Sequence, residues 1–231
     1  MQNLLRASLT SAGGDRLPQT IAARTQKAYD RMSAVYPIST MFFHSRAHRQ
    51  VLRSTDIKDG MRVLEIATGS GEMFRRLLKT NPSGLTIGGD LSPNMAGRTQ
   101  RRVTGRFPHV KAGCQAMDAR HLPFRDKSFD AVVCCYLLEL LSSDDAERAI
   151  GEVRRVLKPG GSLTLVLIGE NKRYFNRIYR FLGALAPAFW GRQICSVVPE
   201  ILSRHQLSIQ SERTIWQSFY PSRVVAVTRC R

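Results

Sequence analysis

Apolar positions along the 231-residue chain change their spacing near residue 60. Before that point, apolar side chains at helical spacing predict a helix over 20–35, and a second helix is expected over 40–54. After a turn at Lys58–Gly60, short continuous apolar runs alternate with amphipathic segments. The predicted strands are 61–67, 85–90, 110–117, 129–137 and 162–169, and the predicted helices between them are 72–80, 92–103 and 142–157. Buried parallel strands separated by helices indicate an α/β sheet covered on both faces.

Local signals mark several ends of these elements. Asn81–Pro82 stops the first helix of the alternating region, and Ser92 followed by Pro93 starts the next one. Residues 142–157 begin with a serine cap and carry acids in the first turn, where the helix dipole favours negative charge. The sequence Lys158-Pro-Gly-Gly161 predicts a turn into the fifth strand.

The last 60 residues follow a different order. Helices are predicted over 171–185 and 197–205, and two strand-like runs, 207–217 and 222–230, come one after the other. A short link between adjacent strands predicts an antiparallel pair at the end of an otherwise parallel sheet.

The net charge of +17 is the strongest compositional anomaly. Residues 1–62 hold 10 Lys and Arg against 4 Asp and Glu, residues 63–170 hold 15 against 12, and residues 171–231 hold 10 against 2. The flanks therefore carry most of the excess. An anionic partner, such as a membrane surface, a nucleic acid or an acidic substrate, explains this pattern, and so do solvated arginines that keep the protein soluble.

Other compositional features bear on location. No apolar run approaches the roughly 20 residues that span a bilayer, and the first residues lack the apolar core of a secretory signal. The five cysteines fit no zinc spacing, and their odd number favours reduced thiols. We therefore expect no metal site and a cytoplasmic protein that can associate with membranes.

The run VLEIATGSGEMF, residues 63–74, joins a strand to a helix through small residues. A dinucleotide fingerprint would place a third glycine where Phe74 stands, and a phosphate loop would end in Gly-Lys-Ser/Thr. Glu72 at the helix start would also repel a pyrophosphate. The loop instead fits acid-x-G-x-G-x-G, with Glu65 as the acid and Ala67 in the first small position.

Further acids follow the next two predicted strands. Asp90 lies about 20 residues past the loop, where it can accept both ribose hydroxyls, and Asp118 can accept from an adenine amino group. A carboxylate at Glu65 suits an ammonium group. An amino acid, a ribose and an adenine together describe S-adenosylmethionine.

The segments VLEIATGSGEM, IGGDLSPNM, MDARHLPFRDKSFDAVVC and VRRVLKPGG resemble the class I S-adenosylmethionine-dependent methyltransferases. Within that class the chain looks most like the group that includes ubiquinone/menaquinone-biosynthesis and phospholipid N-methyltransferases. The upstream TQKAYDRMSAVYP is similar to the lid helix of that group. The resemblance covers about Thr25 to Leu167 and fades after it.

This resemblance implies a Rossmann-like doubly wound sheet of seven strands, mostly parallel with an antiparallel terminal strand, and N-terminal lid helices. The expected organisation is a flexible tail over 1–18, lid helices over 19–59, and a cofactor-binding domain over 60–231 with a helical cap near 171–206.

The resemblance also implies roles for individual residues. Thr68, Gly69 and Gly71 would contact the methionine part of the cofactor, Asp90 the ribose, and Asp118 with Ala119 the adenine edge. Leu91 would pack on the ring, and Cys135 and Tyr136 would lie near the sulfonium. Tyr29 and Tyr36 would close over it from the lid, or else serve as core aromatics. Asp90 and Asp118 could instead be acids that cap turns.

No catalytic residue is assigned from the sequence. A carbon or hydroxyl acceptor needs a base more often than an amine does, and the candidates are His44, His48, His121 and Glu139. The adjacent Cys134 and Cys135 lie in an apolar run without the proline expected beside a nucleophilic cysteine, which favours buried core thiols.

The flanks suggest the substrate. On a helix over 172–185, aromatic and basic side chains form opposing stripes, which suits either an anionic membrane or packing on the domain. The tail lacks the glycine-rich closing motif of the quinone enzymes, which weakens the case for a quinone. The leading hypothesis is methylation of a lipid or hydrophobic small molecule, either a phospholipid amine or a quinone-like acceptor. An RNA methyltransferase and a cofactor-binding protein without catalysis are the alternatives, and the oligomeric state is not predicted.

Overall fold

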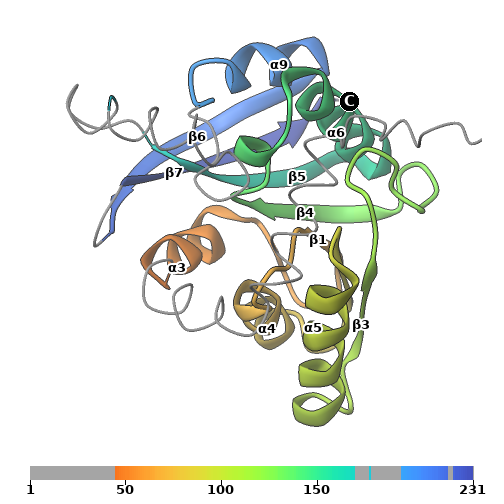
Figure 1. Ribbon diagram of the computed structural model, residues 1–231. Coiled ribbons are helices and arrows are strands. Elements are labelled where there is room, and N and C mark those ends of the chain that lie inside the picture. Colours follow the sequence, from red (N-terminus) through yellow and green to blue (C-terminus); the bar gives the residue numbers. More distant parts are fainter. Residues whose placement is uncertain (1–44, 170–176, 178–193, 218–220, 231) are drawn as a thin grey trace, which may run out of the picture.

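Seven strands form one sheet in the computed structural model, which describes residues 45–169, 177, 194–217 and 221–230 (Figure 1). The strand order is β3-β2-β1-β4-β5-β7-β6. The strands are β1 Arg62–Ile66, β2 Leu85–Asp90, β3 Lys111–Ala116, β4 Phe129–Cys135, β5 Leu157–Ile168, β6 Leu207–Trp216 and β7 Pro221–Arg229. β1 to β5 are parallel, and β7 runs antiparallel to both β5 and β6. The predicted seven-stranded, mostly parallel sheet is confirmed.

Helices cover both faces of this sheet. They are α3 Ser45–Ser54, α4 Glu72–Thr80, α5 Pro93–Arg106, the 3-10 helix η1 Leu138–Leu140, α6 Ser143–Val156 and α9 Val198–Arg204. α3 and α4 share one apolar cluster with strand residues such as Val63 and Val133, and α4 shares a second cluster with α5. α6 and α9 pack on the opposite face against Leu64 and Val132. Figure 1 shows these two helix layers on either side of the sheet.

The predicted caps at Ser92 and Ser142 are confirmed, whereas α5 runs to Arg106, beyond its predicted end at residue 103. The Ser92 hydroxyl accepts the Met95 amide at 3.2 Å, and the Ser142 hydroxyl accepts the Asp145 amide at 3.1 Å. Each bond satisfies one of the amides that the first turn of a helix leaves without a partner. α4 ends where Asn81 follows it, as predicted.

The turn predicted over 158–161 lies inside a strand. β5 begins at Leu157, which pairs with Phe129, whereas Ser162 pairs with Ala131. Between these two pairs β5 advances by five residues while β4 advances by two. The extra residues of β5, which include Gly160 with φ of 75°, therefore bulge out of the strand pairing. The strand starts earlier than the sequence indicates because backbone pairing resumes before the glycines.

Several predictions concern residues outside the described part of the chain. These are the tail 1–18, most of the lid region 19–59 with Tyr29, Tyr36 and His44, and the helix over 172–185 apart from Arg177, which is helical. α3 is the described end of the helix expected over 40–54, and α9 matches the helix expected over 197–205.

Phe74 occupies the helix position where a dinucleotide-binding loop has its third glycine. The room for its ring is provided by a glycine on the neighbouring strand β2. The Phe74 side chain has no exposed area and packs against Gly88 of β2. A methyl group added to Gly88 would lie 2.8 Å from Thr68 Cγ2 and 2.9 Å from Phe74 Cε2. The close approach of α4 to the sheet therefore requires glycine on the strand.

We expect Gly88→Ala to lower the free energy of unfolding by about 1–3 kcal/mol, because the added methyl overpacks the junction of loop, helix and strand. The measurement is chemical denaturation. Gly105→Ala is the matched control: a methyl there meets no atom within 4 Å. Since Gly105 lies in α5, alanine should stabilise the protein by about 0.5–1 kcal/mol. Equal stability of wild type and Gly88→Ala would contradict this account of the packing.

Candidate functional site

The loop between β1 and α4 has an unusual backbone. Ala67, Gly69 and Gly71 all lie in the left-handed region, with φ of 61°, 49° and 75°. Glycine adopts this conformation readily, whereas at Ala67 it is disfavoured and must be held by the surroundings. The Thr68 amide donates to the Gly89 carbonyl at 3.1 Å, and the Gly71 amide donates to the Thr68 carbonyl at 2.8 Å. The loop is thus a tight turn fastened to β2.

Asp90, at the end of β2, supports this loop directly. One carboxylate oxygen accepts the Gly69 amide at 2.8 Å, and the other accepts the Ser92 amide at 3.0 Å. The turn-capping role that the sequence allowed for Asp90 is therefore real. Each carboxylate oxygen has two acceptor directions, so this role is compatible with the predicted contact to ribose. Leu91 follows and is partly buried.

Glu65 is buried in the middle of the sheet with only 1% of its surface exposed. Its Oε2 has no hydrogen-bond partner. Burial, and secondarily the negative charge of Asp90, raises the pKa of the Glu65 carboxyl well above its usual range. An unpartnered buried carboxyl oxygen is costly, and a cationic ligand group nearby would offset that cost.

Asp118 follows β3 and is held by its neighbour Arg120. Oδ2 accepts Arg120 Nη2 at 2.6 Å, while Oδ1 accepts both the Arg120 amide at 2.9 Å and Nε at 3.0 Å. Partial burial opposes ionisation of Asp118, but the bonds from Arg120 outweigh it and lower the pKa of the carboxyl. Arg120 Nη1 also reaches Asp145 in the first turn of α6 at 3.2 Å. The guanidinium therefore ties the loop after β3 to α6, while Ala119 is buried beside Asp118.

The end of β4 carries the residues expected near the reacting sulfur. Tyr136 has φ of 55°, and its hydroxyl lies 2.7 Å from Ser222 Oγ and accepts Gln217 Nε2 at 2.8 Å. Sequence reasoning missed Gln217 and Ser222, because they lie more than 80 residues away and follow no motif. Burial raises the pKa of the thiols of Cys134 and Cys135, which opposes thiolate formation and favours the core-thiol interpretation.

Among the candidate bases, Glu139 is the most distinctive. It is 2% exposed; its Oε1 accepts the Ile168 amide at 2.6 Å, and its Oε2 has no partner. Burial raises the pKa of this carboxyl to about 7. Cys195 Sγ donates to the Ile168 carbonyl at 3.1 Å. Both backbone polar groups of Ile168, at the end of β5, are therefore hydrogen-bonded to buried side chains. His48 is buried on α3, and His121 is exposed.

Taken together, three carboxyl groups, those of Glu65, Asp90 and Asp118, stand on β1 or at the ends of β2 and β3. The cation beside the loop, Arg102, donates to the Ser70 carbonyl. Glu72 at the start of α4 adds a fourth acid, paired with Arg75 at 2.7 Å. An acid-rich site with two left-handed glycines fits a ligand that has an ammonium group and hydroxyls, and it disfavours a pyrophosphate.

Comparison with known proteins agrees with this donor set. Residues 63–161 match the family described as a methyltransferase domain. Residues 63–161 therefore belong to the methyltransferase domain family. The ubiquinone/menaquinone biosynthesis C-methyltransferase UbiE of Desulfotalea psychrophila is 36% identical over 149 residues, which are 64% of this chain and 55% of that protein. The chain spans 55% to 65% of the lengths of this and two further curated relatives.

Solved structures show that the methyltransferase domain shares its fold with other enzymes. The N-methyltransferase NodS of Bradyrhizobium japonicum, in complex with S-adenosyl-L-homocysteine, has a TM-score of 0.72 at 18% identity, covering 90% of this chain and 99% of that chain. The [4+2]-cyclase SpnF has a TM-score of 0.71 at 16% identity, covering 89% and 94%. The same fold therefore occurs with a different named chemistry, and activity must be argued from the site.

We expect Arg120→Ala to weaken binding of S-adenosylmethionine to the methyltransferase domain about tenfold or more, measured by calorimetry. The guanidinium orients the Asp118 carboxylate, so its loss leaves that charged acceptor free to turn away from the adenine amino group. Arg125→Ala is the control, because Arg125 is exposed in the same loop and forms no ion pair among the described residues.

A second ligand separates positioning by Arg120 from a general effect on the fold. The inosine analogue of S-adenosylhomocysteine has an oxo group in place of the adenine amino group and so cannot donate to Asp118 from that position. Wild type should prefer the adenine compound, and Arg120→Ala should reduce that preference. Tighter binding of S-adenosylmethionine by Arg120→Ala would instead show that Arg120 competes with the ligand for Asp118.

Glu139 should make stability depend on pH. Because its folded pKa is about 7, above the usual value of 4.5, the unfolded chain loses this proton first as pH rises. The folded state is then penalised progressively from about pH 5 to about pH 8. We expect Glu139→Gln, which keeps an acceptor for the Ile168 amide, to gain about 2–3 kcal/mol relative to wild type over that interval. Denaturant titrations of both proteins at several pH values measure it, and parallel curves would contradict it.

Proposed function

We propose that the protein transfers the methyl group of S-adenosylmethionine to a hydrophobic, quinone-like acceptor. The observation that carries this proposal is the acid-lined site made by Glu65, Asp90 and Asp118 inside a segment that matches methyltransferase domains. The quinone-like acceptor is supported by relatives that are themselves called quinone or menaquinone methyltransferases. Because the chain spans little more than half of such a relative, its substrate is inferred from the shared part alone.

The cofactor, when bound, supplies a methyl group on a positively charged sulfur, which is already a good leaving group. The protein then acts chiefly by alignment and exclusion of water. Asp90 holds the loop and can bind the ribose, while Asp118, oriented by Arg120, can bind the adenine edge. Glu65 supplies negative charge for the methionine ammonium group. An acceptor carbon or hydroxyl loses a proton as it gains the methyl group, and no residue is assigned to remove it.

A phospholipid amine and RNA are the other acceptors that the sequence suggested. The named relatives favour the quinone-like acceptor over both. The helix over 172–185, proposed from its sequence to contact an anionic membrane, lies outside the described residues. Among the helices that are described, none combines the length and apolar character needed to cross a bilayer.

The test is transfer of isotopically labelled methyl from S-adenosylmethionine to three acceptors offered separately: a short-tailed, water-soluble demethylated quinol, an aminophospholipid in vesicles, and RNA. We expect label in the quinol, identified by a mass gain of one methyl group. The Asp90→Ala variant should show no transfer and at least about tenfold weaker cofactor binding, because it loses two acceptor oxygens at the loop.

The other outcomes contradict the proposal in different ways. Label in RNA or in the phospholipid would replace the acceptor. Calorimetric binding of S-adenosylmethionine without transfer to any of the three would favour a cofactor-binding protein. Transfer that persisted undiminished in Asp90→Ala would point to a contaminating enzyme.

A further inference from the structure

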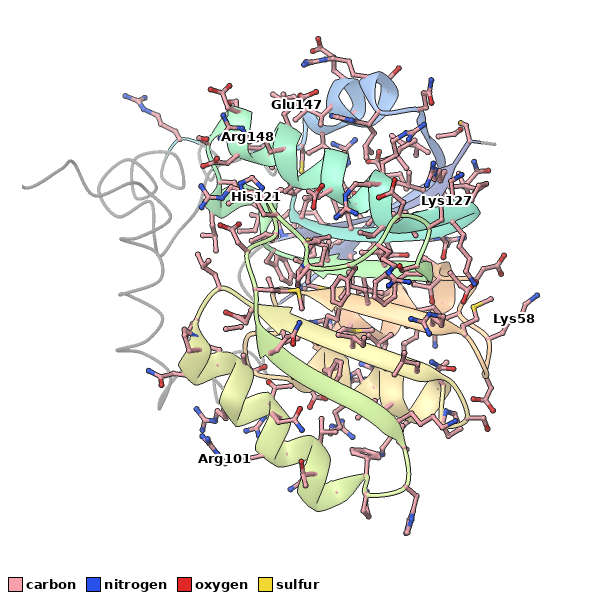
Figure 2. All side chains as sticks on the ribbon, turned by 90° about the vertical axis from the view of Figure 1, so that its right-hand side faces the viewer. Lys58, Arg101, His121, Lys127, Glu147 and Arg148 are labelled. Carbon is pink, nitrogen blue, oxygen red and sulfur yellow. The ribbon has the colours of Figure 1, made fainter. Side chains whose placement is uncertain are left out.

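Charge is distributed unequally between the two helix layers. α3, α4 and α5, on one side of the sheet, contain ten Lys and Arg residues and a single acid, Glu72. α6 and α9, on the other side, contain four Arg residues and five acids. Figure 2 labels Arg101 on α5 and Arg148 on α6, which lie on opposite sides of the sheet. The protein is therefore electrically polarised across its sheet.

Most cations of the α3–α5 layer have no carboxylate partner. Glu72 pairs with Arg75 and Arg76 at 2.7 and 3.0 Å. Seven other cations of the layer are exposed, and together we call them the basic face: Arg46, Arg49, Arg53, Lys79, Arg101, Arg102 and Arg106. In the described part of the chain, none of these seven forms an ion pair. Among the described residues, the carboxylates therefore leave this positive charge uncompensated.

The arrangement on α5 works against the helix itself. Arg98, Arg102 and Arg106 follow one another at intervals of four residues, so their charges lie on one side of the helix and repel. Burial lowers the pKa of Arg102, and the charges of Arg98 and Arg106 lower it further. From Leu91 to Met117 the chain has five Lys and Arg residues and no acid. Binding of an anion along this side of α5 would relieve the repulsion between these arginines.

The surface chemistry of the basic face indicates the kind of partner. The large apolar side chains that are exposed in the described residues, Val197, Ile209 and Trp216, lie on none of these three helices, and only Trp216, whose carbonyl accepts Arg46 Nη1 at 3.5 Å, contacts the basic face. Protein–protein interfaces are typically enriched in aromatic residues at their centre, and binding of single-stranded RNA uses aromatic stacking. A charged bilayer surface requires only cations spread over a broad face.

We propose that the basic face docks the protein on the surface of an anionic lipid bilayer. The proposal rests on the proposed function in one respect: a hydrophobic quinone-like acceptor partitions into bilayers, so a docked enzyme would meet it there. The surface is distinct from the helix over 172–185, and it lies on the opposite side of the sheet from α6 and α9. Docking itself requires no turnover and can be measured without any acceptor.

The experiment is co-sedimentation of the full chain with vesicles of phosphatidylcholine alone or with added phosphatidylglycerol. We expect binding to the mixed vesicles at low salt and release at high salt. The variant Arg101→Glu/Arg106→Glu should lower the partition coefficient about tenfold or more, because each cation near an anionic surface contributes substantially to binding.

The matched control is Arg125→Glu/Lys127→Glu, which changes the net charge equally at exposed positions outside the basic face that form no ion pair among the described residues. It should bind within about twofold of wild type. Circular dichroism melting should show both variants folded, and the first should melt no lower than wild type because repulsion on α5 is relieved. Methylation of the short-tailed soluble quinol should be unchanged in both variants, so failure of docking and failure of the proposed function are distinguished.

Three results would overturn the proposal. The first is no binding of wild type to anionic vesicles at low salt. The second is equal loss of vesicle binding in both double variants, which would show that binding depends on the net charge of the protein and not on the basic face. The third is binding of RNA, but not of vesicles, that is abolished by Arg101→Glu/Arg106→Glu, which would make the basic face a nucleic-acid surface.

Discussion

The Gly69 amide and an Asp90 carboxylate oxygen, 2.8 Å apart, join the loop after β1 to the end of β2. This bond holds a turn that contains three left-handed residues, one of them the alanine at position 67. Together with the bonds from the Thr68 and Gly71 amides, it holds the disfavoured backbone conformation at Ala67. The glycines permit the left-handed backbone conformation of the loop, and the hydrogen bond to Asp90 stabilises one conformation of it. The same side chain is then available to a ligand from its remaining acceptor directions, so the loop and the predicted ribose contact depend on a single carboxylate.

Packing beneath the loop serves the same geometry. Gly88 of β2 admits the Phe74 ring, and a methyl group on Gly89 would lie 2.2 Å from the Met117 side chain on the other face. Two consecutive glycines therefore let α4 approach one face of β2 and the residue before Asp118 approach the other. In a dinucleotide-binding loop the corresponding glycine lies on the helix. In this protein the glycine that allows close packing lies on strand β2 instead. The tight loop and the buried Phe74 ring can therefore occur together.

The sequence predicted what depends on local periodicity and missed what depends on distant neighbours. Strand and helix positions follow from apolar spacing, and the caps at Ser92 and Ser142 follow from residue type, so these were confirmed. The start of β5 at Leu157 was missed because its pairing with Phe129 crosses the Pro-Gly-Gly run. Arg120 on Asp118, and Gln217 with Ser222 on Tyr136, form only after folding. Counting charge over long stretches of sequence hid its distribution in space. The middle of the chain is nearly balanced in sequence, but its helices α4 and α5 are basic and its helix α6 is more acidic, on opposite sides of the sheet.

A protein with a net charge of +17 should repel a cationic cofactor, yet its site is built for one. Distance and screening resolve this conflict. At physiological ionic strength the Debye length is about 8 Å, so exposed cations of the basic face farther than this from the strand ends are largely screened from them, and Arg102, which donates to the Ser70 carbonyl, is the exception. The local carboxylates therefore decide the potential at the site. Burial, and secondarily the negative charge of Asp90, raises the pKa of the Glu65 carboxyl, so this acid is costly to ionise without a ligand. A cationic ligand group beside Glu65 offsets the cost of ionising this carboxyl, so binding of the cation and ionisation of Glu65 reinforce each other. The positive charge of the basic face lies on the helices.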